Sequence, residues 1–131
     1  MDAAAVELGQ WILRVVLALT FIGMGVTHFV PSVARTMAAM IPPILRTRGL
    51  ASPRNLVYFT GVCEIAGGVG LLIPALQFAA GIALAIFLVA VFPANAYAAS
   101  HREKFGRAAI PFWPRLAGQL VLIALCILAA L

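Results

Sequence analysis

Long apolar runs are the feature of this sequence that most restricts its fold. Four of them, at about residues 8–30, 54–73, 76–99 and 114–131, approach or exceed the ~20 residues that carry a helix across ~30 Å of hydrocarbon. Of the 131 residues, 64% are hydrophobic and 10% charged, whereas soluble domains are about 25% charged. No soluble fold of this size could hide so much apolar surface. We therefore predict an all-α polytopic membrane protein, a single domain of four transmembrane helices in an antiparallel bundle.

Prolines lie near the ends of these runs, where a helix tolerates them. Pro31 follows the first run, Pro53 precedes the second, and Pro74 separates the second from the third by a link so short that it predicts an antiparallel hairpin. Pro93 lies inside the third run. There it should kink the helix and free a backbone carbonyl near Asn95.

The longer link at residues 31–53 has an apolar pattern of its own. Val33, Met37, Met40 and Ile41 recur at helical spacing. This predicts a short amphipathic helix lying in the membrane interface, and it leaves open a lid over the mouth of the bundle.

Basic residues give the chain a net charge of +5, but they form two short stretches beside apolar runs rather than the broad stripe of a nucleic-acid-binding protein. They are Arg35, Arg46, Arg48 and Arg54 in the first link and its flank, and Arg102, Lys104 and Arg107 in the third link. By the positive-inside rule both links are cytoplasmic and both termini outside. We expect a bacterial inner membrane. The first run is expected to be retained, because it is too long for a signal peptide and begins with acidic rather than basic residues.

Glu64 lies in the middle of the second run. A carboxylate at this depth costs roughly 2.5–3.5 kcal/mol on insertion scales, so it needs a partner or a function. Arg14 is its expected charge partner, Arg115 approaches from the other side, and Gln119 is placed to donate a hydrogen bond. A purely structural Glu64–Arg14 pair that fixes helix register is the alternative.

The remaining polar residues of the apolar runs also point inward. Residues 14, 18, 21, 25 and 28 are spaced by three or four, so Arg14 and His28 share one helix face. When depth is counted along each helix from its cytoplasmic end, the polar groups lie at successively greater depths toward Glu64. The predicted ligand-binding residues are Glu64, His28, Asn95, Arg14, Arg115, Gln119 and Thr60.

Several of these residues also have structural readings. His28 can be an interfacial or capping residue, Asn95 can satisfy the carbonyl freed by Pro93, and Arg115 can snorkel to the headgroups. Glycines 61, 67, 68 and 70 mark the second helix as central to the bundle, and small-residue faces are compatible with a homodimer.

No sequence motif indicates a catalytic or metal site. HExxH, GxSxG, phosphate-binding and heme-attachment patterns are absent. Cys63 and Cys126 lack CxxC spacing and are interpreted as small core residues. No catalytic residue and no metal ligand is therefore predicted.

Three segments resemble the DoxX-like family of small four-helix membrane proteins: GVTHFVPSVARTMAAMIPP, YFTGVCEIAGGVGLLIP and VFPANAYAA. The family is distantly similar to the receptor-assembly chaperone NACHO. The resemblance implies one four-span domain and places its pattern on His28, Glu64, Asn95 and, less closely, Arg14 and Arg115. Some members are similar to membrane subunits of oxidoreductases, but this chain lacks the paired cysteines of a thiol relay.

The leading functional hypothesis is a protein that is not an enzyme on its own and that binds a small amphipathic ligand, lipid- or quinone-like, or a partner helix inside the bundle. One alternative is a quinone-linked subunit of a membrane oxidoreductase with a soluble redox partner. Another is a membrane assembly chaperone or scaffold. Membrane lipid is an expected partner in all three.

Overall fold

A computed structural model describes residues 2–106 and 110–131 of the chain. This part of the chain is helical and contains no strand, which confirms the all-α class. The elements are α1 (Ala3–Thr27), α2 (Pro31–Ala39), the 3-10 turns η1 (Pro43–Leu45) and η2 (Gly49–Ala51), α3 (Pro53–Leu71), η3 (Pro74–Leu76), α4 (Gln77–Ser100), α5 (Arg102–Phe105) and α6 (Phe112–Ala130).

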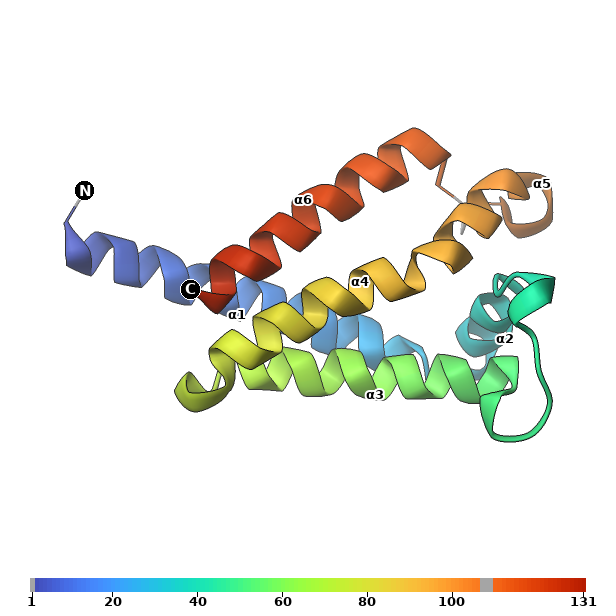
Figure 1. Cartoon of the computed structure of the whole chain (residues 1–131), viewed down its shortest axis with the longest axis horizontal. Helices are drawn as coiled ribbons and strands as arrows, with labels where there is room; N and C mark the ends of the chain where they lie inside the picture. The colour runs from blue at the N-terminus through green and yellow to red at the C-terminus, as the bar shows by residue number, and fades with distance from the viewer. Residues whose placement is uncertain (1, 107–109) are drawn as a thin grey trace.

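The four long helices α1, α3, α4 and α6 alternate in direction along the molecule (Figure 1). α1 packs on α3, α4 packs on α6, and the tight turn η3 joins the two pairs by an α3–α4 hairpin. Both termini lie at one end of the molecule, while α2 and α5 lie at the other (Figure 1). The predicted hairpin is thus confirmed.

The helix boundaries agree with the sequence prediction to within a few residues, except at the start of α1. This helix begins at Ala3 instead of near residue 8, because the Asp2 side chain accepts a hydrogen bond of 2.7 Å from the Ala5 N–H and caps the helix. α1 also ends at Thr27. Pro31 does not close it but occupies the first turn of α2.

Three helices are long and apolar enough to cross a membrane: Ala3–Thr27, Pro74–Ser100 and Phe112–Ala130. α3 is similar in length, with 19 residues, but is not among the three. Arg54 at its start and Glu64 in its middle lower its hydropathy.

Glycines set the distance between neighbouring helices. A Cβ atom added at Gly25 of α1 would lie 2.7 Å from the Gly61 carbonyl oxygen of α3. One added at Gly67 of α3 would lie 2.5 Å from a Leu84 methyl group of α4. Gly81 of α4 approaches the backbone of α6 in the same way. The central position predicted for the glycine-rich helix α3 agrees with its contacts to α1, α2 and α4.

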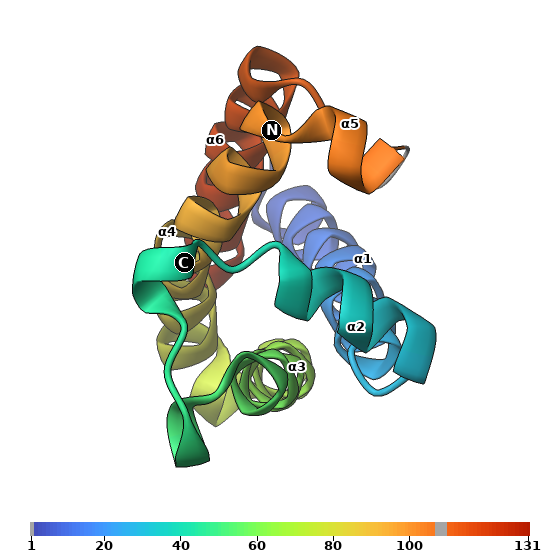
Figure 2. The same ribbon diagram turned by 90° about the vertical axis from the view of Figure 1, so that its right-hand side faces the viewer.

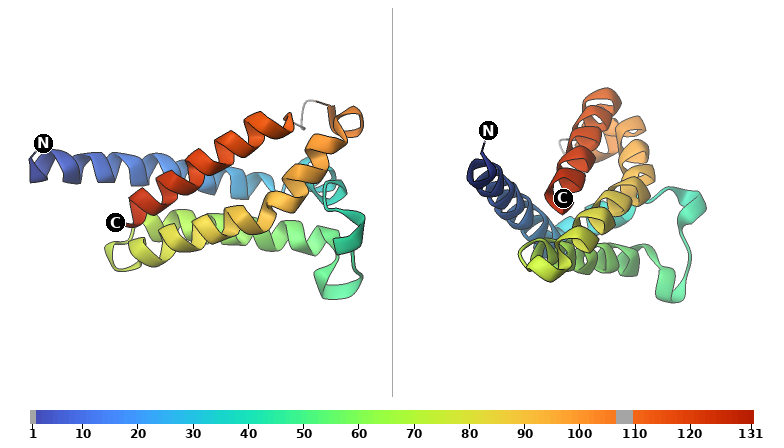
Figure 3. Two further views of the ribbon diagram at one scale, coloured as in Figure 1. Left: turned by 45° about the horizontal axis from the view of Figure 1, so that its top comes forward. Right: turned by 60° about the vertical axis from the view of Figure 1, so that its left-hand side comes forward.

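The two helix pairs lie at an angle to each other (Figure 3). Near the termini they share an apolar core, to which Leu17, Leu71, Leu84 and Cys126 contribute from the four long helices. α4 continues through Pro93 and changes direction in its second half (Figure 3). The pairs therefore meet at one end and diverge toward the other.

α2 is the short helix predicted in the first link. It lies across the end of the molecule opposite the termini (Figure 2), where Ala34 and Ile41 pack with Val57 of α3. The basic residues of both links lie at this same end, except that Arg107 falls outside the described residues.

Candidate functional site

A cavity of about 860 Å3 lies where the two helix pairs diverge. α1, α3, α4 and α6 form its walls, and α2 with the following residues 40–45 covers its end. Most of its lining is apolar, contributed by side chains such as Phe21, Met37 and Leu122. The volume is within the range of small-molecule sites, about 300–1,000 Å3.

Six of the seven residues predicted for the site line this one cavity. They are His28, Thr60, Glu64, Asn95, Arg115 and Gln119. They divide into two groups, one on the wall formed by α1 and α3 and the other on the wall formed by α4 and α6.

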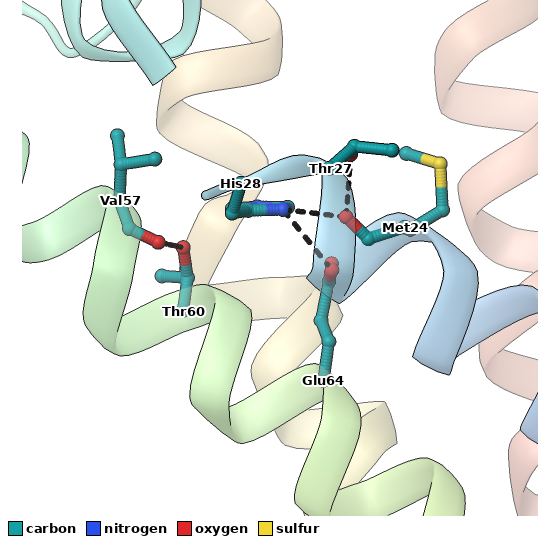
Figure 4. A network of polar contacts seen from close by, with 6 residues as sticks. All are labelled: Met24, Thr27, His28, Val57, Thr60 and Glu64. Atoms are coloured by element: carbon teal, nitrogen blue, oxygen red, sulfur yellow. Dashed lines mark hydrogen bonds and ion pairs between the residues drawn. The ribbon is translucent and has the colours of Figure 1, made fainter. Parts of the chain in front are cut away.

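The first group is an acidic wall around Glu64, which is 8% exposed (Figure 4). The Glu64 Oε2 atom lies 3.6 Å from Nδ1 of His28. That distance is too long for a hydrogen bond, and Oε2 has no hydrogen-bond partner among the described residues. An unpaired acceptor buried in this way costs about 1–3 kcal/mol, which a bound donor would recover.

His28 is held in place by its own helix. It is the C-cap residue of α1, and its Nδ1 lies 2.7 Å from the Met24 carbonyl oxygen (Figure 4). Because a carbonyl only accepts hydrogen bonds, Nδ1 carries a proton. Thr60 also bonds to its own helix, since its hydroxyl donates to the Val57 carbonyl at 2.8 Å. Neither residue supplies Glu64 with a short hydrogen bond.

The second group is a hydrogen-bonded amide wall that includes Arg115. The Arg115 Nη1 donates to Asn95 Oδ1 at 2.9 Å, Asn95 Nδ2 donates to Gln119 Oε1 at 3.4 Å, and Gln119 Nε2 donates to the Leu88 carbonyl at 2.8 Å. These bonds fix the orientation of both amides. The wall therefore presents a permanently positive guanidinium beside two oriented amide groups.

The hydrogen bonds of Asn95 differ from the structural reading of the sequence, in which Asn95 satisfies the carbonyl freed by Pro93. The carbonyl of Val89 loses its usual donor because Pro93 has no N–H, and Gln119 bonds the adjacent Leu88 carbonyl. Asn95 instead links Arg115 to Gln119.

The expected pairing of Arg14 with Glu64 is wrong. Arg14 is not among the cavity-lining residues, and its Nε donates at 2.9 Å to the Ala129 carbonyl in the last turn of α6. Carbonyls at the end of a helix lack intrahelical donors and carry partial negative charge, so they are natural partners for an arginine. The guanidinium carbon also lies 5.5 Å from the centre of the Trp11 ring. Arg14 thus joins α1 to α6 near the end of the molecule where the two helix pairs meet.

Replacing Arg14 with methionine is expected to lower the free energy of unfolding by about 1.5–3 kcal/mol, the usual worth of a hydrogen bond to a charged group. Unfolding in detergent would be followed by far-UV circular dichroism, with the exposed Arg35→Met as the control. Ligand retention should be unchanged. Loss of a ligand without loss of stability would contradict the structural role of Arg14.

Comparison with known proteins supplies a family. The model of the family described as "Domain of unknown function (DUF8561)" matches residues 17–130. The chain belongs to this family. Neither the curated proteins nor the solved structures gave a match. The DUF8561 match includes every residue of the cavity lining but begins after Arg14.

The cavity of this DUF8561 chain opens sideways between α1 and α6. Thr20 and Met24 on α1, and Pro114 and Gly118 on α6, line the cavity and are exposed. At the α2 end, Met37, Met40 and Ile41 contribute to the lining, together with the exposed residues Ser32 and Leu45. An elongated apolar molecule can therefore extend out of the cavity between these two helices.

Sequence reasoning missed Thr20 and Thr36 as polar residues of the lining, whereas the cavity-facing position of α2 agrees with the lid that it left open for the first link. A signal for α2 was present, because the apolar face formed by Val33, Met37, Met40 and Ile41 is the face that lines the cavity. That pattern fits a lid as well as an interfacial helix. Thr20 and Thr36 bond to carbonyls of their own helices, which gives no sequence signal.

Metal ligands do not cluster in the described residues: no three of the His, Cys, Asp and Glu side chains lie close enough to hold an ion. Cys126 is buried, Cys63 is half-buried, and both thiols are free. For binding, the cavity offers the hydrogen-bonding and charged groups of its two polar walls.

Proposed function

We propose that this DUF8561 protein is an integral membrane protein whose four long helices form a transmembrane bundle around a binding site for a small amphipathic molecule, lipid- or quinone-like. The observation that carries the proposal is the largely apolar cavity with polar groups on two facing walls. Pockets of this form are typical of ligand sites. The site binds the polar head near Glu64, Gln119 and Arg115, and the apolar part along the rest of the lining.

The outer faces of the helices support the membrane setting. Leu19, Phe59, Phe78, Ile86 and Leu120 are between 58% and 67% exposed and come from all four long helices. So much exposed apolar surface is unusual for a soluble monomer but suits lipid contact. α3 crosses as the fourth span because Glu64 faces the cavity rather than the lipid.

The resemblance to DoxX-like proteins supports the same four-span arrangement. By the positive-inside rule, the basic residues of the α2 and α5 end support a cytoplasmic position for that end and an outside position for both termini. A bacterial plasma membrane is the setting that the resemblance favours.

The sideways opening supports a ligand that lives in the membrane. Since Thr20, Met24, Pro114 and Gly118 are exposed along the α1–α6 edge, an amphiphile can enter from the bilayer without crossing water. A quinone-linked subunit is the second candidate, favoured by the Glu64–His28 pair at 3.6 Å on the cavity wall, which places two proton-carrying groups beside a bound quinone.

Native mass spectrometry of the protein purified in mild detergent tests the proposal. The wild type should carry a defined amphiphile, and Glu64→Gln should retain about tenfold less of it, since one charge-assisted hydrogen bond is lost. Glu7→Gln makes the same chemical change at an exposed position and serves as the control. Folded wild-type protein without any adduct would overturn the proposal, and a quinone adduct would favour the second candidate.

A further inference from the structure

We infer that the protein holds the headgroup of an anionic phospholipid in a second site, between the side chains of Arg35 on α2 and Lys104 on α5. This site lies at the α2 and α5 end of the molecule and shares only Thr36 with the lining of the large cavity. The inference adds a second site to the proposed function and rests on its membrane setting.

A hollow of about 310 Å3 separates the two short helices that lie together at this end of the molecule (Figure 2). Arg35 and Ala39 line the hollow from α2, and Lys104 and Phe105 line it from α5. Residues 35 and 39 are one helical turn apart and share a face of α2, whereas Met37 lines the large cavity. α2 thus contributes one face to the large cavity and another to this hollow.

Two cations from distant parts of the chain meet in the hollow. Among the described residues, neither Arg35 nor Lys104 forms an ion pair with an Asp or Glu side chain. Arg46 differs, because its guanidinium donates to the Ala39 and Ile41 carbonyls at 2.7 and 2.9 Å and caps the end of α2. Like charges that line one hollow repel each other, and an anion bound between them replaces that repulsion by two attractions.

A phosphate group is the anion that suits these two cations. The guanidinium of Arg35 can bind two phosphate oxygens at once, and the ammonium of Lys104 binds phosphate as a point charge. The Lys104 Nζ lies 5.5 Å from the centre of the Phe105 ring, a contact that holds the ammonium without neutralising it. The Thr36 hydroxyl donates to the Ser32 carbonyl at 3.1 Å, so the two charged side chains supply the donors of the site.

The position of the hollow indicates that the phosphate belongs to a lipid. Trp113 is 74% exposed in the first turn of α6, which begins at this same end of the molecule (Figure 1). Exposed tryptophan is typical of the level at which membrane headgroups lie. In the orientation proposed above this end faces the cytoplasm, where anionic lipids of the inner leaflet attract basic residues close to the surface.

A lipid competition tests the inference. The wild-type protein would be incubated in mixed micelles with equal amounts of phosphatidylglycerol and phosphatidylcholine, and the lipids retained in native mass spectra would be counted. The anionic glycerol lipid should be retained about tenfold more, because the two cations repel the choline group of the other lipid. Equal retention would overturn the inference and leave the proposed amphiphile site intact.

Free inorganic phosphate separates a lipid from a soluble ligand. Added in an amount equal to the lipid, it should not displace phosphatidylglycerol, because it lacks the acyl chains that add to binding. Displacement would assign the hollow to a soluble phosphate compound and would overturn the inference.

A double variant assigns the preference to the hollow. Arg35→Gln combined with Lys104→Gln should reduce the preference to about one. Arg48→Gln combined with Arg102→Gln removes one exposed cation from each of the same two links, outside the hollow, and should leave the preference unchanged. An equal loss in both double variants, or an unchanged preference in the first, would overturn the inference.

The double variant should also fold and keep the amphiphile of the large cavity. Arg35 and Lys104 are exposed, donate no side-chain hydrogen bond to the described residues, and do not line that cavity. Far-UV circular dichroism would check the fold, and native mass spectra would count the amphiphile. Joint loss of the amphiphile and of the lipid preference in a folded double variant would place the anionic lipid in the large cavity and overturn the second site.

Discussion

Leucine in place of Gly25 is expected to force α1 away from α3 and to lower the free energy of unfolding by about 3 kcal/mol or more. A Cβ atom at Gly25 would lie 2.7 Å from both the Gly61 carbonyl oxygen and a side-chain carbon of Ile65. The carbonyl is backbone, so it cannot move without shifting α3 as a whole. Because His28 and Glu64 lie on these same two helices, the acidic wall of the cavity should be lost as well.

Gly23→Leu is the matched control. It lies two residues away on the same helix, is exposed, and has nothing within 4 Å of an added Cβ. It should be neutral or slightly stabilising, since leucine favours helix more than glycine does. Thermal unfolding in detergent would compare the two. Equal stability of both variants would contradict the close α1–α3 packing.

Tryptophan in place of Gly118 is expected to cut amphiphile retention to about one tenth of the wild-type amount or less, because it fills the cavity mouth. Gly118 shares a helix face with Arg115, Gln119 and Leu122, and all four line the cavity. An added Cβ meets nothing within 4 Å, so the fold should survive the change. Lipid extracted per mole of purified protein, quantified by mass spectrometry, is the measurement.

Ala124→Trp adds the same side chain to an exposed position of α6 that does not line the cavity. The Ala124→Trp variant should retain as much amphiphile as the wild type. If Gly118→Trp retained as much amphiphile as Ala124→Trp, the molecule would be bound somewhere other than the cavity.

Helix positions were predictable because local signals set them. Apolar runs bounded by Pro31, Pro53 and Pro74 gave the helices to within a few residues, and the spacing of Arg14, Phe21, Gly25 and His28 correctly gave one buried face of α1. Asp2 followed by alanines is a cap signal that would also have placed the start of α1.

Pairings between helices were less predictable. Residues that share a face of α1 do not share a site, because Arg14 and His28 are 14 positions apart, a rise of about 21 Å along the helix. Which partner each residue contacts depends on the axial positions of α3 and α6 relative to α1. That register is set by glycine contacts such as Gly25 with Gly61, which sequence spacing within a single helix does not reveal.

The cavity itself was predictable only as a convergence of polar residues. Its volume and its sideways opening depend on the angle between the α1–α3 and α4–α6 pairs. The bend of α4 at Pro93 contributes to that angle, and the proline predicted the position of the bend but not its direction.

Photo-crosslinking with a diazirine-bearing phospholipid tests the central claim, an amphiphile inside the cavity, most directly. The lipid would carry the diazirine near its headgroup and be irradiated in vesicles containing the wild-type protein. We predict that labels identified by peptide sequencing fall on the cavity-facing residues of the stretches 56–64 and 115–122, and that Gly118→Trp removes them. Labels confined to outward residues such as Leu19, Phe59 and Ile86, and unchanged in Gly118→Trp, would contradict the account.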